Sequence, residues 1–205
     1  MLQPLLIATS NPGKFQEIAE FLQGVPYELV SLADKGIAAD FEENGATFQE
    51  NAIGKAKYYA EKSGLMTLAE DSGIVVDALA GELGVKTRRW GKGENVSDEE
   101  WVKYFLEVMR KVPVEKRTAS FFCEAALVDA EGQVFTFEGK STGVITKKLE
   151  APIKKGLPLS SCFRPDGFDR VYAALSVEEK NRISHRGKAM AKVREELNYE
   201  LRIRN

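Results

Sequence analysis

The chain has few cysteines, a single histidine and almost no net charge. Cys123 and Cys162 lie far apart and outside any Cys-x-x-Cys pattern, so neither a disulfide framework nor a zinc site is indicated. The 29 basic and 31 acidic side chains give a formal charge of −2, which provides no overall attraction for nucleic acid or an anionic membrane. We therefore expect a reducing, cytoplasmic setting and no nucleic-acid partner.

The sequence also lacks long hydrophobic runs. No apolar segment approaches the ~20 residues that a membrane-spanning helix needs, and the first residues lack the basic segment of a secretory signal. At 43% hydrophobic residues the chain is nevertheless rich enough to bury a core. Since there is no internal repeat, low-complexity tract or linker, we expect one domain over residues 1–205 and no membrane partner.

Short apolar runs predict strands, and apolar residues at helical spacing behind capping residues predict helices. Thr47 with Glu50, and Ser97 with Glu100, form the capping-box pattern of a helix N-terminus. The pattern predicts an α/β fold with strands at residues 4–8, 27–32, 66–69, 118–128 and 133–145, the last two as an antiparallel hairpin. It predicts helices at about residues 15–22, 47–64, 97–113 and 184–201, a short helix or extended segment at 74–79, a capped segment from Ser176, and loops at 9–14, 39–46 and 151–167.

The most chemically informative segment is Ala69-Glu70-Asp71-Ser72-Gly73, which follows a predicted buried strand. Open α/β sheets bind ligands beyond the carboxyl ends of their strands, so both carboxylates are expected at such an edge. Hard oxygen ligands there suit Mg²⁺, which takes one or two carboxylates and completes its shell with water and phosphate. Asp-Ser-Gly is also ordinary turn chemistry, so this segment alone leaves a structural turn and a metal site open.

Two further segments are candidate phosphate contacts. Thr9-Ser10-Asn11-Pro12-Gly13-Lys14 joins a predicted strand to a helix, where backbone N–H groups and the lysine could receive phosphate oxygens. The segment lacks the Walker A pattern, and Asn-Pro-Gly is equally typical of a turn. In the helix at 47–64, Asn51 and Lys55 share a face, and Lys55 is either a phosphate contact or a solvated side chain.

Near the C-terminus, Ser184-His185-Arg186-Gly187 places the only histidine beside an arginine at the start of a predicted helix. An imidazole, a guanidinium and a helix N-terminus together form a directional site for a carbonyl group or an anion. Ser184 can equally be a plain N-cap.

Taken in chain order, these segments resemble the inosine/xanthosine triphosphate pyrophosphatase family, whose members hydrolyse non-canonical purine nucleoside triphosphates to the monophosphate and pyrophosphate. The similarity spans nearly the whole chain. It implies an elongated ITPase-like α/β fold with a long mixed β-sheet, helices forming two lobes around a central cleft, and a homodimer. The segments that carry it are Thr9–Lys14, Glu50-Asn51-Ala52 with Lys55, Ala69–Gly73, Val76-Asp77-Ala78-Leu79 and Ser184–Gly187.

The resemblance also implies roles for individual residues. The triphosphate would be held by Thr9–Lys14 and Lys55, Ser72 would contact the substrate, and Glu43 and Asp71 would bind Mg²⁺. Asp71 is in addition the implied proton acceptor, and the sequence leaves open whether it acts as base, metal ligand or both. Glu70, the neighbouring carboxylate, is a second possible base or ligand.

Base recognition is implied for Phe163, Asp166, Lys180, His185 and Arg186. In this interpretation Phe163 stacks on the purine, while His185 and Arg186 donate to the 6-oxo oxygen of hypoxanthine or xanthine. Adenine presents an amino donor at that position and would leave those donors unpaired.

One loop departs from the family pattern. Cys162-Phe163-Arg164-Pro165-Asp166-Gly167-Phe168 carries a proline where an aromatic residue is expected, and Pro-Asp-Gly is itself a turn sequence. Base preference therefore stays open between non-canonical purines, such as ITP, dITP and XTP, and another modified nucleotide. A non-catalytic nucleotide-binding protein of the same fold is the alternative from a different functional class.

Overall fold

The computed structural model describes residues 2–93 and 95–204. Its helices and strands, in chain order, are β1 (Gln3–Ile7), α1 (Pro12–Phe21), β2 (Tyr27–Ser31), α2 (Phe48–Ser63), β3 (Met66–Val76), α3 (Asp98–Met109), β4 (Thr118–Val128), β5 (Val134–Ile145), β6 (Phe163–Pro165), α4 (Val177–Ile183) and α5 (His185–Arg204). Short 3₁₀ turns are η1 (Asp77–Leu79), η2 (Gly84–Arg89), η3 (Val114–Lys116), η4 (Pro158–Ser161) and η5 (Tyr172–Ala174). Within these described ranges, no helix is both long and apolar enough to span a bilayer.

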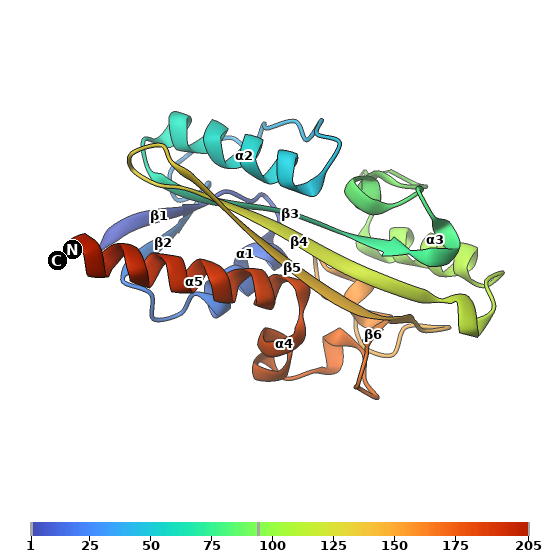
Figure 1. The fold of residues 1–205 in the computed structure, drawn as a ribbon. Coiled ribbons are helices and arrows are strands. Elements are labelled where there is room, and N and C mark those ends of the chain that lie inside the picture. The colour runs from blue at the N-terminus through green and yellow to red at the C-terminus, as the bar shows by residue number, and fades with distance from the viewer. Residues whose placement is uncertain (1, 94, 205) are drawn as a thin grey trace.

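The strands of the described chain form one mixed sheet in the order β2-β1-β3-β4-β5-β6. β1 pairs in parallel with β2 and β3, whereas β3, β4, β5 and β6 pair antiparallel in succession. The sheet runs the length of an elongated molecule, with α2 on one face and α5 on the other (Figure 1). The α/β class and the long mixed sheet expected from the sequence are therefore confirmed.

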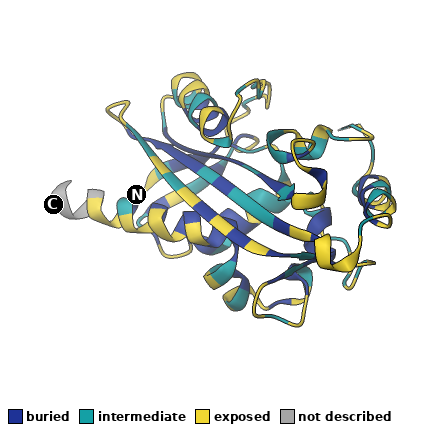
Figure 2. Ribbon diagram, turned by 45° about the vertical axis from the view of Figure 1, so that its right-hand side comes forward, coloured by how far each residue is buried: buried dark blue, intermediate teal, exposed yellow. Residues whose placement is uncertain are grey.

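Strand alternation divides the core between the two faces of the sheet. Leu5 and Ile7 of β1 pack with α1 and α5, while Leu6 between them packs with Ala52 and Ala56 of α2. A third cluster lies at the far end of the sheet, where Trp101, Phe105 and other α3 residues pack against the ends of β3 and β4. Buried residues accordingly follow the middle of the central strands, and the outer faces of the helices are exposed (Figure 2).

β3 is longer than predicted, which corrects the expected position of Glu70 and Asp71. The strand does not end after Ala69, because β4 pairs with it from Thr67 to Val76 and prevents a turn at Ser72-Gly73. Its parallel partner β1 stops opposite Leu68, where the Ala8 amide donates to the Leu68 carbonyl oxygen at 2.8 Å. The two carboxylates therefore lie in mid-strand, beside the place where β1 ends and β3 loses its neighbour on one side.

Two helix starts also differ in detail from the prediction. α1 begins at Pro12, not after Lys14, because Asn11 acts as N-cap and accepts a hydrogen bond from the Lys14 amide at 3.0 Å. Thr47 caps α2 as predicted, but the Glu50 carboxylate accepts from the amide of Ala46 and not from that of Thr47.

The segment at residues 151–167, expected to be a loop, contains η4 and β6. Its apolar residues Leu159, Cys162 and Phe163 are buried against the far end of the sheet, and this burial overrides the local turn signals of proline and glycine. The segment also contacts the start of α1, where Asn11 Nδ2 donates to the Gly156 carbonyl oxygen at 3.0 Å.

Candidate active site

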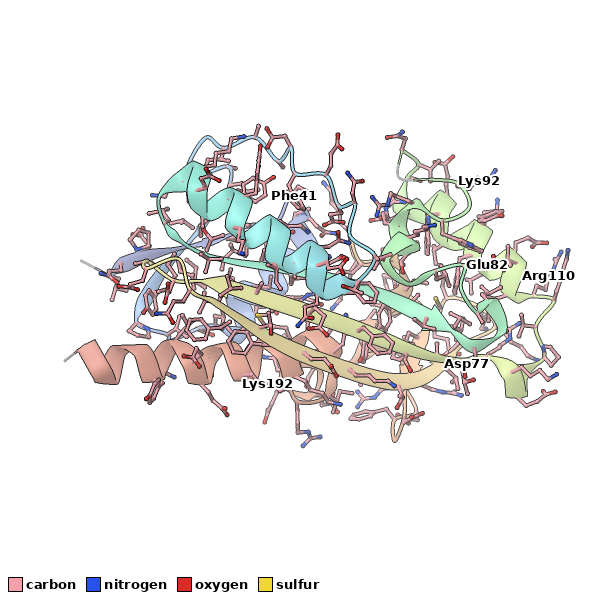
Figure 3. All side chains as sticks on the ribbon, turned by 45° about the horizontal axis from the view of Figure 1, so that its top comes forward. Phe41, Asp77, Glu82, Lys92, Arg110 and Lys192 are labelled. Atoms are coloured by element: carbon pink, nitrogen blue, oxygen red, sulfur yellow. The ribbon has the colours of Figure 1, made fainter. Side chains whose placement is uncertain are left out.

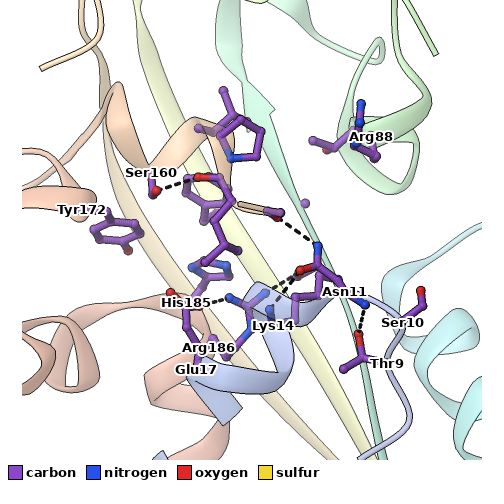
Figure 4. Close-up of a pocket in the computed structure, with 18 of the residues that line it drawn as sticks. Thr9, Ser10, Asn11, Lys14, Glu17, Arg88, Ser160, Tyr172, His185 and Arg186 are labelled. Carbon is purple, nitrogen blue, oxygen red and sulfur yellow. Dashed lines mark hydrogen bonds and ion pairs between the residues drawn. The ribbon is translucent and has the colours of Figure 1, made fainter. Parts of the chain in front are cut away.

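A cavity of about 290 Å³ lies beside β3, past the point where β1 ends. The turn after β1 and the start of α1 form one wall, η2 and η4 form the opposite wall, and the start of α5 closes one end. Arg88 lies across the cavity from Lys14, with His185 and Arg186 beside Glu17 (Figure 4). The lining residues that bear on the chemistry are Thr9, Ser10, Asn11, Lys14, Glu17, Glu43, Lys55, Ser72, Arg88, Arg89, Phe121, Tyr172, Lys180, His185 and Arg186.

Strand alternation sends the two carboxylates of β3 to opposite faces of the sheet. Glu70 points to the α5 face, where its Oε1 lies 2.8 Å from Lys14 Nζ and 3.4 Å from an Arg186 nitrogen. Cys123 donates its thiol hydrogen to the other carboxylate oxygen of Glu70 at 3.3 Å. Burial alone would raise the pKa of Glu70, but the charges of Arg186 and Lys14 hold that pKa well below its usual range. Glu70 is thus ionised at neutral pH as a partner of cations, and it is unsuited to act as a base there.

Asp71 points to the α2 face and has the opposite electrostatic behaviour. Its carboxylate accepts hydrogen bonds from Asn51 Nδ2 at 2.9 Å and from the Ser72 amide at 2.8 Å. Burial raises the pKa of Asp71 to about 6, and the negative charge of Glu43 adds to this effect while the two nearby lysines oppose it. This carboxyl group is poised to exchange a proton near neutral pH or to hold a cation.

The loop before α2 brings Glu43 to the same side. Phe41 anchors this loop by lying over α2 (Figure 3), where its ring centroid is 5.6 Å from that of Tyr58. Glu43 forms an ion pair with Lys55, whose ammonium group also donates to the Glu70 carbonyl oxygen at 3.2 Å. Lys55 therefore faces β3, as its spacing of four residues from Asn51 along α2 indicated.

A divalent cation fits the donors at this point. In the part of the chain that the structure describes, no group of three or more His, Cys, Asp or Glu side chains is suited to bind a metal. Mg²⁺ does not require one, because it is held by one or two carboxylates and takes its remaining ligands from water and phosphate. The negative charge of Glu43 adds to the effect of burial in raising the pKa of Asp71, and a cation between the two carboxylates would relieve their repulsion.

At the α5 end of the cavity, a buried carboxylate organises two cations. Glu17 of α1 forms ion pairs with both Lys180 and Arg186, and Arg186 also donates to Ser72 Oγ at 3.0 Å. Burial opposes ionisation of Glu17, but the charges of Arg186 and Lys180 lower its pKa below the ordinary value. The fork of Arg186 is thus fixed by carboxylates on two different elements.

His185 lies in a stack of rings. Its centroid is 4.6 Å from that of Phe121 and 6.2 Å from that of Tyr172, with interplanar angles of 14° and 11°. Burial lowers the pKa of His185 well below its usual value, helped by the charge of Arg186, so the imidazole is neutral at physiological pH. Its Nδ1 has no hydrogen-bond partner within the described residues. A neutral histidine within a stack of aromatic rings suits recognition of a heterocycle better than binding of a phosphate.

Two of the expected base contacts are not brought into the cavity. Phe163 is fully buried in the cluster at the far end of the sheet and does not line the cavity. Its ring packs edge-on with that of Phe121, with 4.8 Å between the ring centroids. Asp166 lies in a surface turn, where its carboxylate accepts from Thr142 Oγ1 at 2.5 Å. Phe163 pairs with β5 as part of strand β6, which fixes the direction of its side chain. Asp166 follows directly in the turn, where its amide donates to the Thr142 carbonyl oxygen at 3.0 Å. Phe121 and Tyr172 are the aromatic rings that border the cavity beside His185.

Several other residues are placed differently from the sequence hypothesis. Pro12 and Gly13 border a neighbouring hollow on the outer side of α1, and Asp71 lies next to the main cavity without lining it. The sequence motifs did not indicate Glu17 as a site residue, although its position three residues after Lys14 places both on one face of α1. Arg89 was also missed, and nothing in its sequence neighbourhood distinguishes it from a solvated arginine.

Comparisons with known proteins agree with this geometry. The model of the Ham1 family matches residues 5–196. The dITP/XTP pyrophosphatase of Geobacter sulfurreducens is 42% identical over 197 residues, covering 96% of this chain and 97% of that protein. That of a Thermus thermophilus strain is 41% identical over 187 residues, covering 91% and 87%. Among solved structures, a HAM1 protein from Coxiella burnetii matches with a TM-score of 0.79 at 32% identity, covering 97% of this chain and all of that one. The Staphylococcus aureus Ham1 protein matches with a TM-score of 0.78 at 30% identity and the same coverage.

Proposed function

Because the chain belongs to the Ham1 family, we propose that it is a nucleoside triphosphate pyrophosphatase acting on non-canonical purine nucleotides such as dITP, ITP and XTP. The products would be the nucleoside monophosphate and pyrophosphate. The observation that carries the proposal is a single cavity with two distinct ends. One end offers a neutral imidazole and a fixed guanidinium among aromatic rings, and the other offers lysines beside two carboxylates.

The phosphate end is proposed to bind the triphosphate through Lys14, Lys55 and the polar groups of Thr9–Asn11. Mg²⁺ is the cation we propose for Glu43 and Asp71, where it would polarise phosphate oxygens and lower the pKa of a coordinated water. Asp71 is the proposed proton acceptor, since its pKa of about 6 permits both proton uptake and ionisation near neutral pH. Glu70 would keep Lys14 and Arg186 charged and oriented, and would not itself take a proton.

The base end is proposed to recognise the 6-oxo group. Arg186 is always a donor, and the free nitrogen of neutral His185 can donate or accept according to its tautomer. Phe121 and Tyr172 replace Phe163 as the proposed aromatic neighbours of the base, because they border the cavity. An adenine amino group facing the Arg186 donors would leave buried hydrogen-bonding groups unpaired, so ATP is expected to be a poor substrate.

Three broader properties are proposed alongside this activity. We propose that residues 1–205 act as one enzymatic domain, and that its partner is a small nucleotide and not a nucleic acid. A cytoplasmic location is supported by two thiols, Cys123 and Cys162, that are free and buried. A homodimer is proposed from the resemblance, and sedimentation equilibrium would decide it by giving one or two times the chain mass of 22.8 kDa.

Pyrophosphate release from a panel of triphosphates would test the function. With Mg²⁺ present, we expect rapid turnover of ITP, dITP and XTP, slow turnover of ATP, GTP and pyrimidine triphosphates, and no turnover by Asp71→Asn. Preference for another base would retain the chemistry and refute the substrate. Tight binding of triphosphates without turnover would instead indicate a non-catalytic nucleotide-binding protein.

A further inference from the structure

Among the cations that border the cavity, Arg88, Arg89 and Lys180 have no role in the proposed function, and Arg89 differs from the other two in its partners. Arg89, the last residue of η2, borders the main cavity and donates to the carbonyl oxygen of Glu43, whose side chain forms an ion pair with Lys55. It also borders an adjoining hollow together with Thr9, Ser10 and Glu43. The arginine therefore lies at the phosphate end of the cavity, on the wall that faces the start of α1.

Arg89 differs from the other cations of the cavity in its partners. Across residues 2–93 and 95–199, each other lysine or arginine that borders the cavity has a carboxylate oxygen within 4 Å: Lys14 has Glu70, Lys55 has Glu43, Arg88 has Asp98, Lys180 has Glu17, and Arg186 has Glu17 and Glu70. Arg89 donates only to carbonyl oxygens, that of Glu43 at 3.1 Å and that of Val85 at 3.3 Å. Among the described lysines and arginines that border the cavity, Arg89 is the one whose charge no carboxylate neutralises, so it is available to an anion.

The backbone around Arg89 is fixed even though its side chain is exposed. Thr87 Oγ1 accepts from the Ile74 amide at 3.0 Å and donates to the Gly84 carbonyl oxygen at 2.6 Å, which docks η2 onto β3. Gly73 permits this close approach, because a Cβ there would lie 2.5 Å from the Gly84 oxygen. On the other side of Arg89, Trp90 packs against Trp101 with 6.3 Å between ring centroids. The guanidinium is thus presented from an anchored turn.

We propose that Arg89 binds the β- and γ-phosphates of the substrate and remains bound to them as pyrophosphate leaves. This inference rests on the proposed function, which places the base at the His185 end and hence the terminal phosphates toward Lys55 and Arg89. A guanidinium binds two phosphate oxygens at once through shorter, charge-assisted hydrogen bonds. Such bonds would replace its two hydrogen bonds to the uncharged carbonyl oxygens of Glu43 and Val85.

The same residue would also assist the chemical step. As the oxygen of water bonds to the α-phosphorus, the bond from that phosphorus to the bridging oxygen breaks and its electron pair stays on pyrophosphate. The proton of water passes to the general base. Arg89 would offset the charge that develops on the leaving pyrophosphate, so η2 would add a phosphate contact to those that Lys14 and Lys55 provide.

Binding of inorganic pyrophosphate and of IMP, measured by calorimetry at saturating Mg²⁺, tests this assignment. We expect Arg89→Ala to weaken pyrophosphate binding at least tenfold and to leave IMP binding within twofold of wild type. Arg89→Lys, which keeps the charge but loses the planar fork, should be intermediate. Lys86→Ala removes an exposed charge from the same turn without touching the cavity, and it should bind both ligands like wild type.

Three results would overturn the assignment. Pyrophosphate affinity within twofold of wild type would mean that Arg89 does not contact these phosphates. Equal losses for pyrophosphate and IMP would indicate a disturbed cavity, and a loss confined to Mg²⁺ affinity would make Arg89 a positioning residue for Glu43. Wild-type turnover of dITP tests the proposed function separately, since pyrophosphate binding is measured without any turnover.

Discussion

At the scale of single residues, the neighbouring carboxylates of β3 have different tasks because a strand sends them to opposite faces. Glu70 meets Lys14 and Arg186, so it stays ionised and fixes two cations. Asp71 meets Asn51 and the charge of Glu43, so its pKa lies near 6. The two neighbouring carboxylates thus differ in function because their environments differ: Glu70 holds cations in place, and Asp71 is the reactive group.

The raised pKa of Asp71 leads to a dependence of activity on pH and on the metal. Since kcat/KM reports ionisations of the free enzyme, it should fall as the pH drops through about 6 at limiting Mg²⁺. A cation favours the ionised carboxylate, so saturating Mg²⁺ should move the midpoint to lower pH. Initial rates with dITP from pH 5 to 8 at both Mg²⁺ concentrations measure this. A midpoint that ignores Mg²⁺ would show that Asp71 is not a metal ligand.

Glu17 should matter for stability as well as for recognition of the base. Glu17→Gln leaves Lys180 without its buried counter-ion and Arg186 with Glu70 alone, and breaking a buried pair in this way costs about 3 kcal/mol. Urea unfolding would measure that loss. Glu20→Gln, one turn further along α1, is the matched control and should change stability little. A Glu17→Gln protein as stable as wild type would mean that the two cations find other partners.

At the scale of elements, the sequence predicted most helices and strands but not the extent of β3. Periodicity located α2, α3 and the β4–β5 hairpin because each has a clear apolar face and a recognisable cap or turn. It ended this strand at Ala69 because the polar residues and the glycine that follow resemble a turn, whereas pairing with β4 extends the strand to Val76. Pairing with a strand that is distant in sequence cannot be predicted from the local sequence.

The same limit applies to the candidate site. Lys14, Lys55, Asp71 and the His185-Arg186 pair could be proposed from motifs, because each lies in a short segment with its own chemical signature. Phe121 could not, since a strand aromatic becomes a wall of a cavity only when η5 and α5 pack beside it. Residues on elements far apart in sequence are the part of a site that motifs leave out.

The packing of α5 on β5 is expected to set the position of His185, and a substitution at this contact tests that expectation. A Cβ at Gly139 of β5 would lie 1.9 Å from the His185 carbonyl oxygen, so Gly139→Ala must displace the first turn of α5. We expect a stability loss of about 1–3 kcal/mol from overpacking and a fall of more than tenfold in kcat/KM for dITP. Unfolding and steady-state kinetics measure these two effects.

The neighbouring residue provides the control for that substitution. Lys140→Ala changes a side chain that lies over the ring of Phe122, on the opposite face of β5. It should leave kcat/KM near the wild-type value. Full activity in Gly139→Ala would contradict the view that contact between β5 and α5 sets the position of His185.

At the scale of the whole molecule, the cavity joins two parts of the chain that have separate cores. The cluster around α1 and α5 supplies Lys14, Glu17 and Arg186, whereas the cluster around α3 supports η2 and η4 on the opposite wall. Asn11 links the walls directly, because its Nδ2 donates to the Gly156 carbonyl oxygen at 3.0 Å. A ligand that touches both walls should therefore bring them into closer association.

Hydrogen exchange can follow this association along the chain. When pyrophosphate and IMP bind together with Mg²⁺, amides at residues 9–14 and at residues 84–93 and 156–161 should all exchange more slowly, because ligand binding suppresses local opening of both walls. IMP alone should protect the start of α5 more than residues 84–93, since the base end lies away from η2. Arg89→Ala should selectively remove the protection that pyrophosphate gives to residues 84–93. Protection restricted to residues 9–14 under every condition would mean that a single wall holds the nucleotide, and that the second wall only encloses it.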